Sequence, residues 1–164
     1  MTITIVTTAD RPDLAHTTGT WRWEAFFSDG ETSLAEVLEL DAQCASSQDV
    51  MPTVLVMLEE QAPVGMVALC LDDLEGRPEL NPWLAGLYMD PKYRGRGHSL
   101  TLIHQLEALA RNAGIERLSL YSAEAVGLYS KAGWATVETF ERDDKTFSIM
   151  QKQLSPHIEK ARYA

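Results

Sequence analysis

Residues 83–112 read WLAGLYMDPKYRGRGHSLTLIHQLEALARN, and this stretch decides how the chain folds. Its first seven residues are apolar and predict a buried strand, while apolar residues recurring every three or four positions after Gly97 predict a helix. Gly95 and Gly97 separate the two elements. Glycine lets the backbone approach a ligand closely, and the N–H groups at a helix N-terminus attract anions. The stretch therefore predicts a phosphate-binding turn between a strand and a helix.

Taken alone, the two glycines are a weak signal. Leu100 stands where a dinucleotide-binding fingerprint has its third glycine, and no Lys-Ser or Lys-Thr follows as a P-loop requires. An ordinary strand-to-helix turn with two solvated arginines, Arg94 and Arg96, explains the same residues. The rest of the chain has to decide between the two interpretations.

The composition indicates one folded domain whose main partner is not nucleic acid. The 164 residues can form a single hydrophobic core, which we expect over residues 1–154, followed by a C-terminal tail at 155–164. With 24 acidic and 14 basic residues the formal net charge is -10, whereas nucleic-acid binding requires a basic surface. An acidic surface favours a cationic partner through long-range attraction, and solubility alone explains it equally well.

The sequence gives no indication of secretion, a membrane span or a metal site. Residues 1–5 lack the basic region and long apolar core of a signal peptide, and no apolar run approaches the roughly 18 residues of a membrane span. Cys44 and Cys70 lack metal-ligand spacing and cannot form a disulfide framework. We therefore expect a cytoplasmic protein with buried thiols, no metal and no membrane partner.

The remaining segments predict a mixed α/β domain. Apolar runs predict six further strands, and helical spacing predicts three further helices. The expected elements outside 83–112 are a strand over 2–8, a helix over about 11–27 with Asp10 as cap and 17–20 as a candidate break, a helix after the capping box Ser33–Glu36, strands over 53–59 and 64–71, a strand over 118–121, a helix over 123–131 capped by Ser122, and strands over 134–142 and 146–154. The order is β-α-α-β-β-β-α-β-α-β-β, with a parallel crossover from 83 to 121.

This order of elements resembles the Gcn5-related N-acetyltransferase (GNAT) family, which has an acyl-CoA N-acyltransferase fold. The segment Leu87–Gly97 is similar to the acetyl-coenzyme A segment of that family, and Leu128–Trp134 is similar to its tyrosine-bearing helix. His98 and Ser99 depart from the pattern, where an aliphatic residue and a Gly or Ala are usual. Serine is still small enough for the turn, and we expect His98 to point to solvent.

The resemblance implies an enzyme that moves an acetyl group from acetyl-CoA to an amine by direct transfer in a ternary complex. The backbone of Leu87, Tyr88 and Met89 would bind the pantetheine arm, and one of their N–H groups would polarise the thioester carbonyl. The other cofactor-binding residues would hold the pyrophosphate: Arg94, Gly95, Arg96, Gly97, His98, Ser99 and Leu100.

The resemblance also makes Tyr129 the candidate general acid for the departing thiolate, since a phenol with a pKa of about 10 suits a thiol of about 8.5. A packed ring with a satisfied hydroxyl is the alternative for this tyrosine. A base is needed too, because an alkylamine is mostly protonated at neutral pH. Glu24, Asp72, Asp73 and Glu79 are candidates, as is an ordered water, and no motif distinguishes among them.

The acceptor site is expected where aromatic residues meet carboxylates, at Trp21, Glu24, Asp72 and Trp83. Such groups bind organic cations, although core packing explains large aromatics equally well. We therefore expect a small-molecule primary amine as acceptor. Acetylation of a protein N-terminus or lysine is one alternative, and a catalytically inactive CoA-binding sensor or interaction module is another. Relatives often pair through their last strands, so the strand at 146–154 is a candidate contact in a homodimer.

Overall fold

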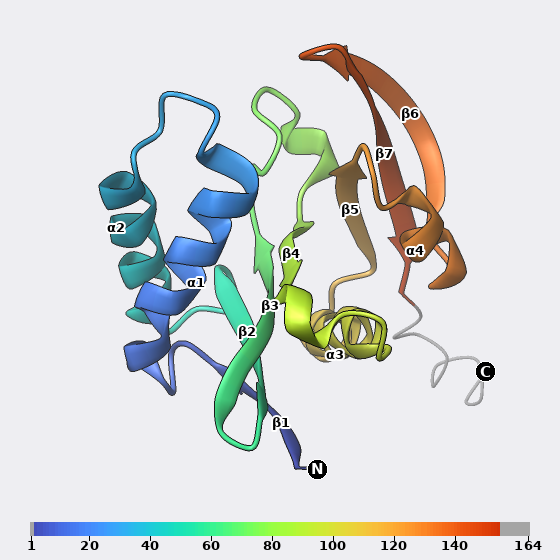
Figure 1. Cartoon of the computed structure of the whole chain (residues 1–164). Helices are drawn as coiled ribbons and strands as arrows, with labels where there is room; N and C mark the ends of the chain where they lie inside the picture. Colours follow the sequence, from blue (N-terminus) through green and yellow to red (C-terminus); the bar gives the residue numbers. More distant parts are fainter. Residues whose placement is uncertain (1, 155–164) are drawn as a thin grey trace, which may run out of the picture.

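Seven strands form one sheet in the order β1-β2-β3-β4-β5-β7-β6, in a computed structural model that describes residues 2–154 (Figure 1). Neighbouring strands are antiparallel except β4 and β5, which are parallel as predicted. The strands are β1 (Ile3–Thr7), β2 (Thr53–Glu59), β3 (Ala62–Cys70), β4 (Trp83–Met89), β5 (Arg117–Ser122), β6 (Ala135–Arg142) and β7 (Lys145–Gln153). The expected tail at 155–164 lies outside the described residues.

Four α-helices and four short helical turns connect these strands. The α-helices are α1 (Ala15–Arg22), α2 (Leu34–Ala45), α3 (His98–Asn112) and α4 (Val126–Lys131). The short turns are η1 (Pro12–Leu14), η2 (Trp23–Phe27), η3 (Pro78–Leu80) and η4 (Pro91–Tyr93). The predicted mixed α/β class and the order of the long elements are confirmed.

Local chemistry explains where α2 and the hairpins begin. The side chain of Ser33 accepts a hydrogen bond from the Glu36 N–H, and the Glu36 side chain accepts one from the Ser33 N–H, so the predicted capping box is confirmed. Asp143 and Asp144 have positive φ angles and join β6 to β7, as a two-residue hairpin turn requires.

Three predicted details of the helices were wrong. The expected break at 17–20 lies inside the continuous helix α1, which follows the proline turn η1 and ends in the π-helical turn η2. Asp10 is not a cap, since the residue before η1 is Arg11 and no side-chain hydrogen bond caps this end of the helix. Ser122 caps the turn before α4 by accepting from the Ala125 N–H at 3.0 Å, so α4 starts three residues later than predicted.

One predicted strand end was also wrong. Glu60 and Gln61 alone turn the chain, both with positive φ, so β3 begins two residues before the expected start at 64. Strand β7 pairs with β5 on one edge and with β6 on the other. Within residues 2–154 neither edge of β7 is therefore free to pair with a strand of a second copy, and the candidate homodimer stays a prediction.

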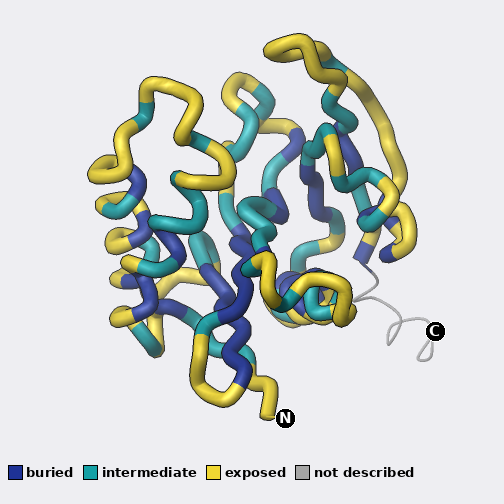
Figure 2. The backbone as a smooth tube through the Cα atoms, viewed as in Figure 1, coloured by how far each residue is buried: buried dark blue, intermediate teal, exposed yellow. Residues whose placement is uncertain are grey.

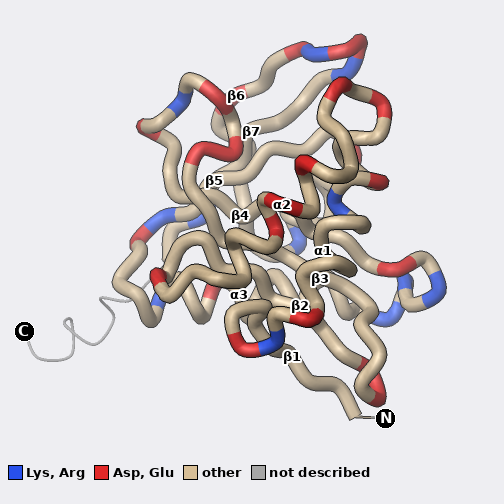
Figure 3. The backbone as a smooth tube through the Cα atoms, turned by 90° about the vertical axis from the view of Figure 1, so that its left-hand side faces the viewer, with Lys and Arg blue, Asp and Glu red and all other residues tan. Residues whose placement is uncertain are grey.

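Separate clusters of apolar side chains cover the two faces of the sheet. Helices α3 and α4 pack on one face over a core that includes Leu102, Leu106 and Tyr129. Leu14 and half-buried Trp21 cover part of the other face, beneath α1. In Figure 2 burial is concentrated in the central strands, while the outer sides of α2 and the β6–β7 hairpin are exposed. In Figure 3 acidic positions occur along several elements of the backbone.

A buried charge joins α1 to α2. Asp41 of α2 is 1% exposed and accepts a 2.6 Å hydrogen bond from the hydroxyl of Thr18, which is fully buried. The guanidinium of Arg22, at the end of α1, forms an ion pair with the second oxygen of the same carboxylate. A carboxylate buried this deeply needs both partners, because an unpaired buried charge costs several kcal/mol.

Replacing Asp41 should therefore loosen the pair of helices. Asp41→Ala leaves the Arg22 guanidinium and the Thr18 hydroxyl without their partner, and we expect the free energy of unfolding to fall by about 3 kcal/mol. Glu39→Ala is the control, because Glu39 lies exposed on the same helix and should change stability by less than about 0.5 kcal/mol. Urea denaturation followed by circular dichroism measures both variants, and equal midpoints would contradict the structural role of Asp41.

Candidate active site

The turn between β4 and α3 is held in place by its own side chains. Asp90 accepts a 2.9 Å hydrogen bond from the Lys92 N–H, which closes the short turn η4. The Nε of Arg94 donates to the carbonyl of Met89, also at 2.9 Å. These contacts fix the direction in which the chain enters the glycine segment, so its backbone groups have a defined orientation before any ligand arrives.

Helix α3 begins without a side-chain cap. Its N-cap residue is Gly97, with a left-handed φ of 80°, and a Cβ placed there would meet nothing within 4 Å. The first helical bond runs from the Thr101 N–H to the Gly97 carbonyl at 3.2 Å. Helix geometry therefore leaves the N–H groups of His98, Ser99 and Leu100 without helical acceptors, facing open space at the positive end of the helix dipole.

Two exposed arginines flank this helix start, on either side of Gly95. The Arg94 guanidinium lies 5.7 Å from the ring centroid of Tyr88, and that of Arg96 lies 5.2 Å from the ring centroid of Tyr93. Aromatic rings hold both cations without neutralising them. Backbone N–H groups and positive side chains thus converge on one turn, as a diphosphate group requires.

A buried carboxylate lies behind the same turn. Glu59, at the end of β2, is 8% exposed; its Oε1 is 3.5 Å from Arg96 and 3.8 Å from Nε2 of His98. This Nε2 is buried and has no hydrogen-bond partner within residues 2–154. The expectation that His98 points to solvent was therefore wrong, because the imidazole turns inward toward Glu59 at the base of the turn.

Strand β4 pairs with β5 only at its first residue, so most of this edge of β4 is unpaired before the chain reaches the glycine turn. β4 and β5 share a single residue pair, Trp83 with Ser119, and then diverge. On its other edge β4 shifts register against β3 around Gly86 and Leu87, and Gly86 has a left-handed φ of 63°. The bulge re-aims the backbone of β4 next to the gap. Main-chain groups beyond Trp83 on the side of β5 are consequently free to meet a ligand.

Tyr129 lies on the helical face of this gap. It belongs to α4, is 6% exposed and packs edge-on against Trp134 with ring centroids 6.1 Å apart. The indole N–H of Trp134 donates to the buried carboxylate of Glu107 on α3, which also binds Lys152 of β7. Burial raises the pKa of Tyr129, and the negative charge of Asp73 raises it further. The phenol is therefore held rigidly and keeps its proton at neutral pH.

Three of the four candidate bases are poorly placed for that role. Glu24 is exposed on η2. Asp72 is exposed and bound to Asn81, which donates to its carboxylate at 3.0 Å. Glu79 is exposed, and its hydrogen bond from Arg77 lowers its pKa, which makes it a weaker base.

Asp73 differs from the other three. It is half-buried, and burial raises its pKa to about 6 even though the positive charges of Arg22 and Arg142 act in the opposite direction. The carboxyl has no hydrogen-bond or ion-pair partner within residues 2–154. A carboxylate whose pKa lies near neutrality can accept a proton and release it again. Asp73 is therefore the strongest candidate for a base among the carboxylates named from the sequence.

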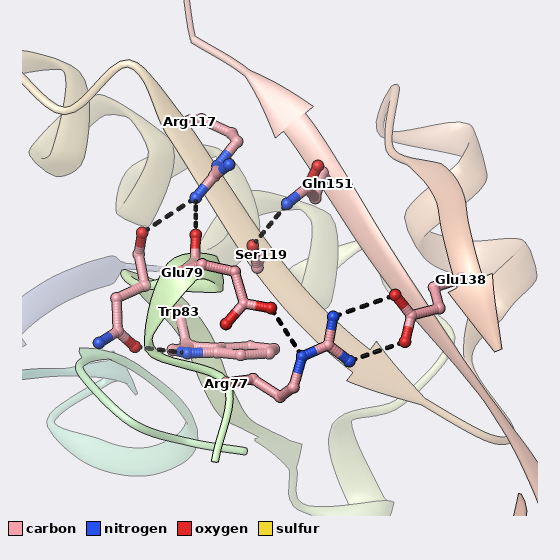
Figure 4. Close-up of polar contacts among 8 residues, drawn as sticks. Arg77, Glu79, Trp83, Arg117, Ser119, Glu138 and Gln151 are labelled. Atoms are coloured by element: carbon pink, nitrogen blue, oxygen red, sulfur yellow. Dashed lines mark hydrogen bonds and ion pairs between the residues drawn. The ribbon is translucent and has the colours of Figure 1, made fainter. Parts of the chain in front are cut away.

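Polar contacts anchor the loop that carries Asp73 (Figure 4). Arg77 binds Glu138 of β6 through two hydrogen bonds of 2.7 and 3.0 Å, and it also binds Glu79. Arg117 of β5 donates to the carbonyls of Glu79 and Asn81. The loop between β3 and β4 is thus tied to two strands on the far side of the gap, so Asp73 is fixed beside the site.

The aromatic residues predicted at the acceptor site have other surroundings. Trp83 is fully buried and donates its indole N–H to Asn81 at 2.7 Å, so it is a core residue and no acceptor contact. Trp21 packs on Tyr88 with ring centroids 5.3 Å apart, on the α1 face of the sheet. Cys70 faces the same region, where burial and the charge of Asp73 raise its pKa to about 12.

Within the described chain, no group of three or more His, Cys, Asp or Glu residues could hold a metal ion. Among the same residues, no helix is long and apolar enough to cross a membrane.

The sequence matches a known family over most of its length. Residues 16–134 match the model of the Acetyltransferase (GNAT) family. Because this match covers more than half of the chain, the chain belongs to that family. It is therefore an acyltransferase of the N-acetyltransferase type.

Solved structures of acetyltransferases share the fold. An acetyltransferase of the GNAT family from Streptococcus pneumoniae aligns with a TM-score of 0.70 at 21% identity, over 93% of this chain and 99% of its own. yncA from Salmonella typhimurium, solved with its cofactor acetyl-CoA, aligns with a TM-score of 0.69 at 17% identity, over 94% of this chain and 95% of its own. The spermidine/spermine N-acetyltransferase SpeG from Vibrio cholerae aligns with a TM-score of 0.68 at 14% identity, over 98% of this chain and 99% of its own. These identities establish the fold alone. No protein of curated function matches significantly.

The turn at Gly97 allows a direct test of donor binding. Gly97→Asp places a side chain at a left-handed φ and adds a negative charge where the diphosphate is expected, so CoA binding should be lost. Gly114→Asp is the matched control, because Gly114 has a φ of 83°, equally open surroundings and a place at the other end of the same helix. Isothermal titration calorimetry with CoA compares the two folded variants. Binding that survives in Gly97→Asp would show that the turn is not the diphosphate site.

Proposed function

We propose that this enzyme transfers the acetyl group of acetyl-CoA directly to the primary amine of a small molecule. The proposal is supported by two side chains near the edge of β4 that β5 leaves unpaired beyond Trp83: the half-buried carboxyl of Asp73, in the loop before β4, and the buried phenol of Tyr129, on α4. One group is suited to accept a proton and the other to donate one. Acetyl transfer from a thioester to an ammonium requires both.

The two groups are reached from opposite faces of the sheet. Trp83 and Leu84 are neighbours in β4 and point to opposite faces, and Leu84 belongs to the same core as Tyr129. Trp83 packs with Tyr121, whose hydroxyl donates to the Asp73 carbonyl at 3.5 Å. The donor can therefore lie on the α3 and α4 face, while the acceptor approaches from the α1 face.

Each residue then has a separate task. Bound acetyl-CoA supplies an activated acetyl group, whose C–S bond breaks as the C–N bond to the acceptor forms. Asp73 takes a proton from the acceptor ammonium and passes it to solvent, and the nitrogen releases its second proton to solvent once the C–N bond has formed. Tyr129 gives its proton to the departing sulfur and regains one from solvent.

The half-buried position of Asp73, between α1 and the β6–β7 hairpin, supports a small acceptor. The fold also accommodates small amines elsewhere, since SpeG is a spermidine/spermine N-acetyltransferase. Acetyl-CoA-dependent release of thiol in the presence of a panel of free amines, but not of peptides, tests this proposal. If no amine accelerates the release of thiol, the proposal that this site transfers acetyl groups to small amines is wrong.

The pH dependence should report Asp73. Because the base works in its ionised form and its pKa is about 6, kcat/KM should fall as the pH drops through about 6, in addition to the slope from the amine itself. Asp73→Asn should remove this inflection and lower kcat/KM by about 100-fold. Asp72→Asn is the control, because the adjacent carboxylate is exposed and its variant should retain the inflection. An unchanged profile in Asp73→Asn would assign the proton transfer to water.

Tyr129→Phe removes the proposed acid and keeps the ring. We expect kcat to fall by about 100-fold, because the thiolate must then leave without a proton from the enzyme. The affinity for CoA should stay within about twofold, since the donor turn is untouched. Thiol release measures kcat, and calorimetry with CoA measures the affinity. Turnover at the level of the unmodified enzyme would remove Tyr129 from the mechanism.

A further inference from the structure

Arg142 stands at the end of β6 over three aromatic rings. Its guanidinium carbon lies 5.3 Å from the ring centroid of Tyr121, 5.7 Å from that of Phe140 and 4.9 Å from that of Phe147. We refer to these three rings as the aromatic platform. Phe140 and Phe147 stack with centroids 5.2 Å apart and an interplanar angle of 10°. The platform therefore holds the guanidinium in one orientation without supplying a negative charge.

Arg142 has no acidic partner of its own. Within residues 2–154 the guanidinium of Arg142 forms no hydrogen bond and no ion pair, whereas Arg22 is paired with Asp41 and Arg77 with Glu138. Two other arginines without a carboxylate partner, Arg94 and Arg117, donate to backbone carbonyls instead. The exposed guanidinium of Arg142 thus keeps its full charge and its bidentate hydrogen-bonding edge for a partner that the described chain does not provide.

The platform adjoins the proposed base. Tyr121 belongs to the platform, and its hydroxyl donates to the carbonyl of Asp73 at 3.5 Å. Arg142 lies over the same Tyr121 ring whose hydroxyl reaches the Asp73 backbone, and its positive charge acts on the Asp73 carboxyl. Arg22 also acts on Asp73, but its charge is balanced by buried Asp41. The acceptor side of the site therefore offers one unbalanced negative group and one unbalanced positive group.

We propose that the acceptor is an α-amino acid, whose carboxylate binds Arg142 while its amine lies at Asp73. This inference rests on the proposed function and names its substrate class. A planar guanidinium binds a carboxylate through two parallel hydrogen bonds, and orientation by the rings lowers the entropy lost on binding. A zwitterion has no net charge, so the formal charge of -10 on the protein does not repel it as it would repel a simple anion.

Matched acceptors test the carboxylate directly. L-Leucine is compared with 3-methylbutylamine, L-phenylalanine with 2-phenylethylamine, and L-lysine with cadaverine, each pair differing by the carboxylate. The measured quantity is the ratio of kcat/KM for the amino acid to that for its amine. The amine group of an amino acid and that of its matched compound differ in pKa. The decisive comparison is therefore between this ratio in a variant and the ratio in the unmodified enzyme, because the pKa difference affects both equally.

Arg142→Gln should lower the amino-acid-to-amine ratio by about tenfold or more in at least one pair, since it removes a charge-assisted pair of hydrogen bonds. Arg142→Lys keeps the charge without the planar edge and should give an intermediate ratio. Arg11→Gln removes the same charge from an exposed arginine paired with Asp13, and it should leave the ratio unchanged. Thermal unfolding confirms that each variant is folded.

The outcomes separate the two levels of the proposal. If amines are acetylated but the ratio is the same in Arg142→Gln as in the unmodified enzyme, the amino-acid assignment is wrong and the proposed function stands. If the ratio falls equally in Arg11→Gln, the effect is one of overall charge, and the assignment to Arg142 is wrong. If no compound in the three pairs accelerates thiol release, both the assignment and the proposed function are overturned.

Discussion

The divergence of β4 from β5 is the constraint on which the site depends. A sheet gains stability from continuous pairing, and β5 pairs with β7 through six residues, yet β4 and β5 share only Trp83 with Ser119. The bulge at Gly86 and the loop before β4 compensate for this loss, the first by turning the backbone and the second by bridging the gap with side chains. The opening is thus built from irregular backbone, while the two cores on either face stay intact.

Ion pairing around this opening determines which charges are available. Asp41 neutralises Arg22, and Glu138 neutralises Arg77, so two of the arginines near the gap serve the structure. Glu59 offsets part of the charge of Arg96 behind the donor turn. What is left is a positive turn at the start of α3 and a half-buried carboxyl in the loop before β4. Burial outweighs two nearby cations at that carboxyl, which is why its pKa rises rather than falls.

Elements encoded by neighbouring residues could be predicted from the sequence, and those set by distant contacts could not. Strand β4 and the start and end of α3 follow from an apolar run and glycines, and the Ser33 cap follows from a four-residue pattern. The choice of Asp73 over the other carboxylates depends on how its loop packs against α1 and β6, which no local pattern records. The prediction that Trp83 contacts the acceptor was wrong for the same reason, because the burial of this side chain depends on β5, β7 and the loop before β4.

The raised pKa of Cys70 has a consequence for how acetyl groups can travel in this enzyme. Thioesters exchange with thiolates, so an ionised cysteine beside the gap would capture the acetyl group and hold it on the protein. With a pKa of about 12, only about one Cys70 in 100,000 is ionised at neutral pH. Burial and an adjacent carboxylate therefore keep this sulfur protonated at neutral pH, so Cys70 is a poor acceptor for an acetyl group from a thioester.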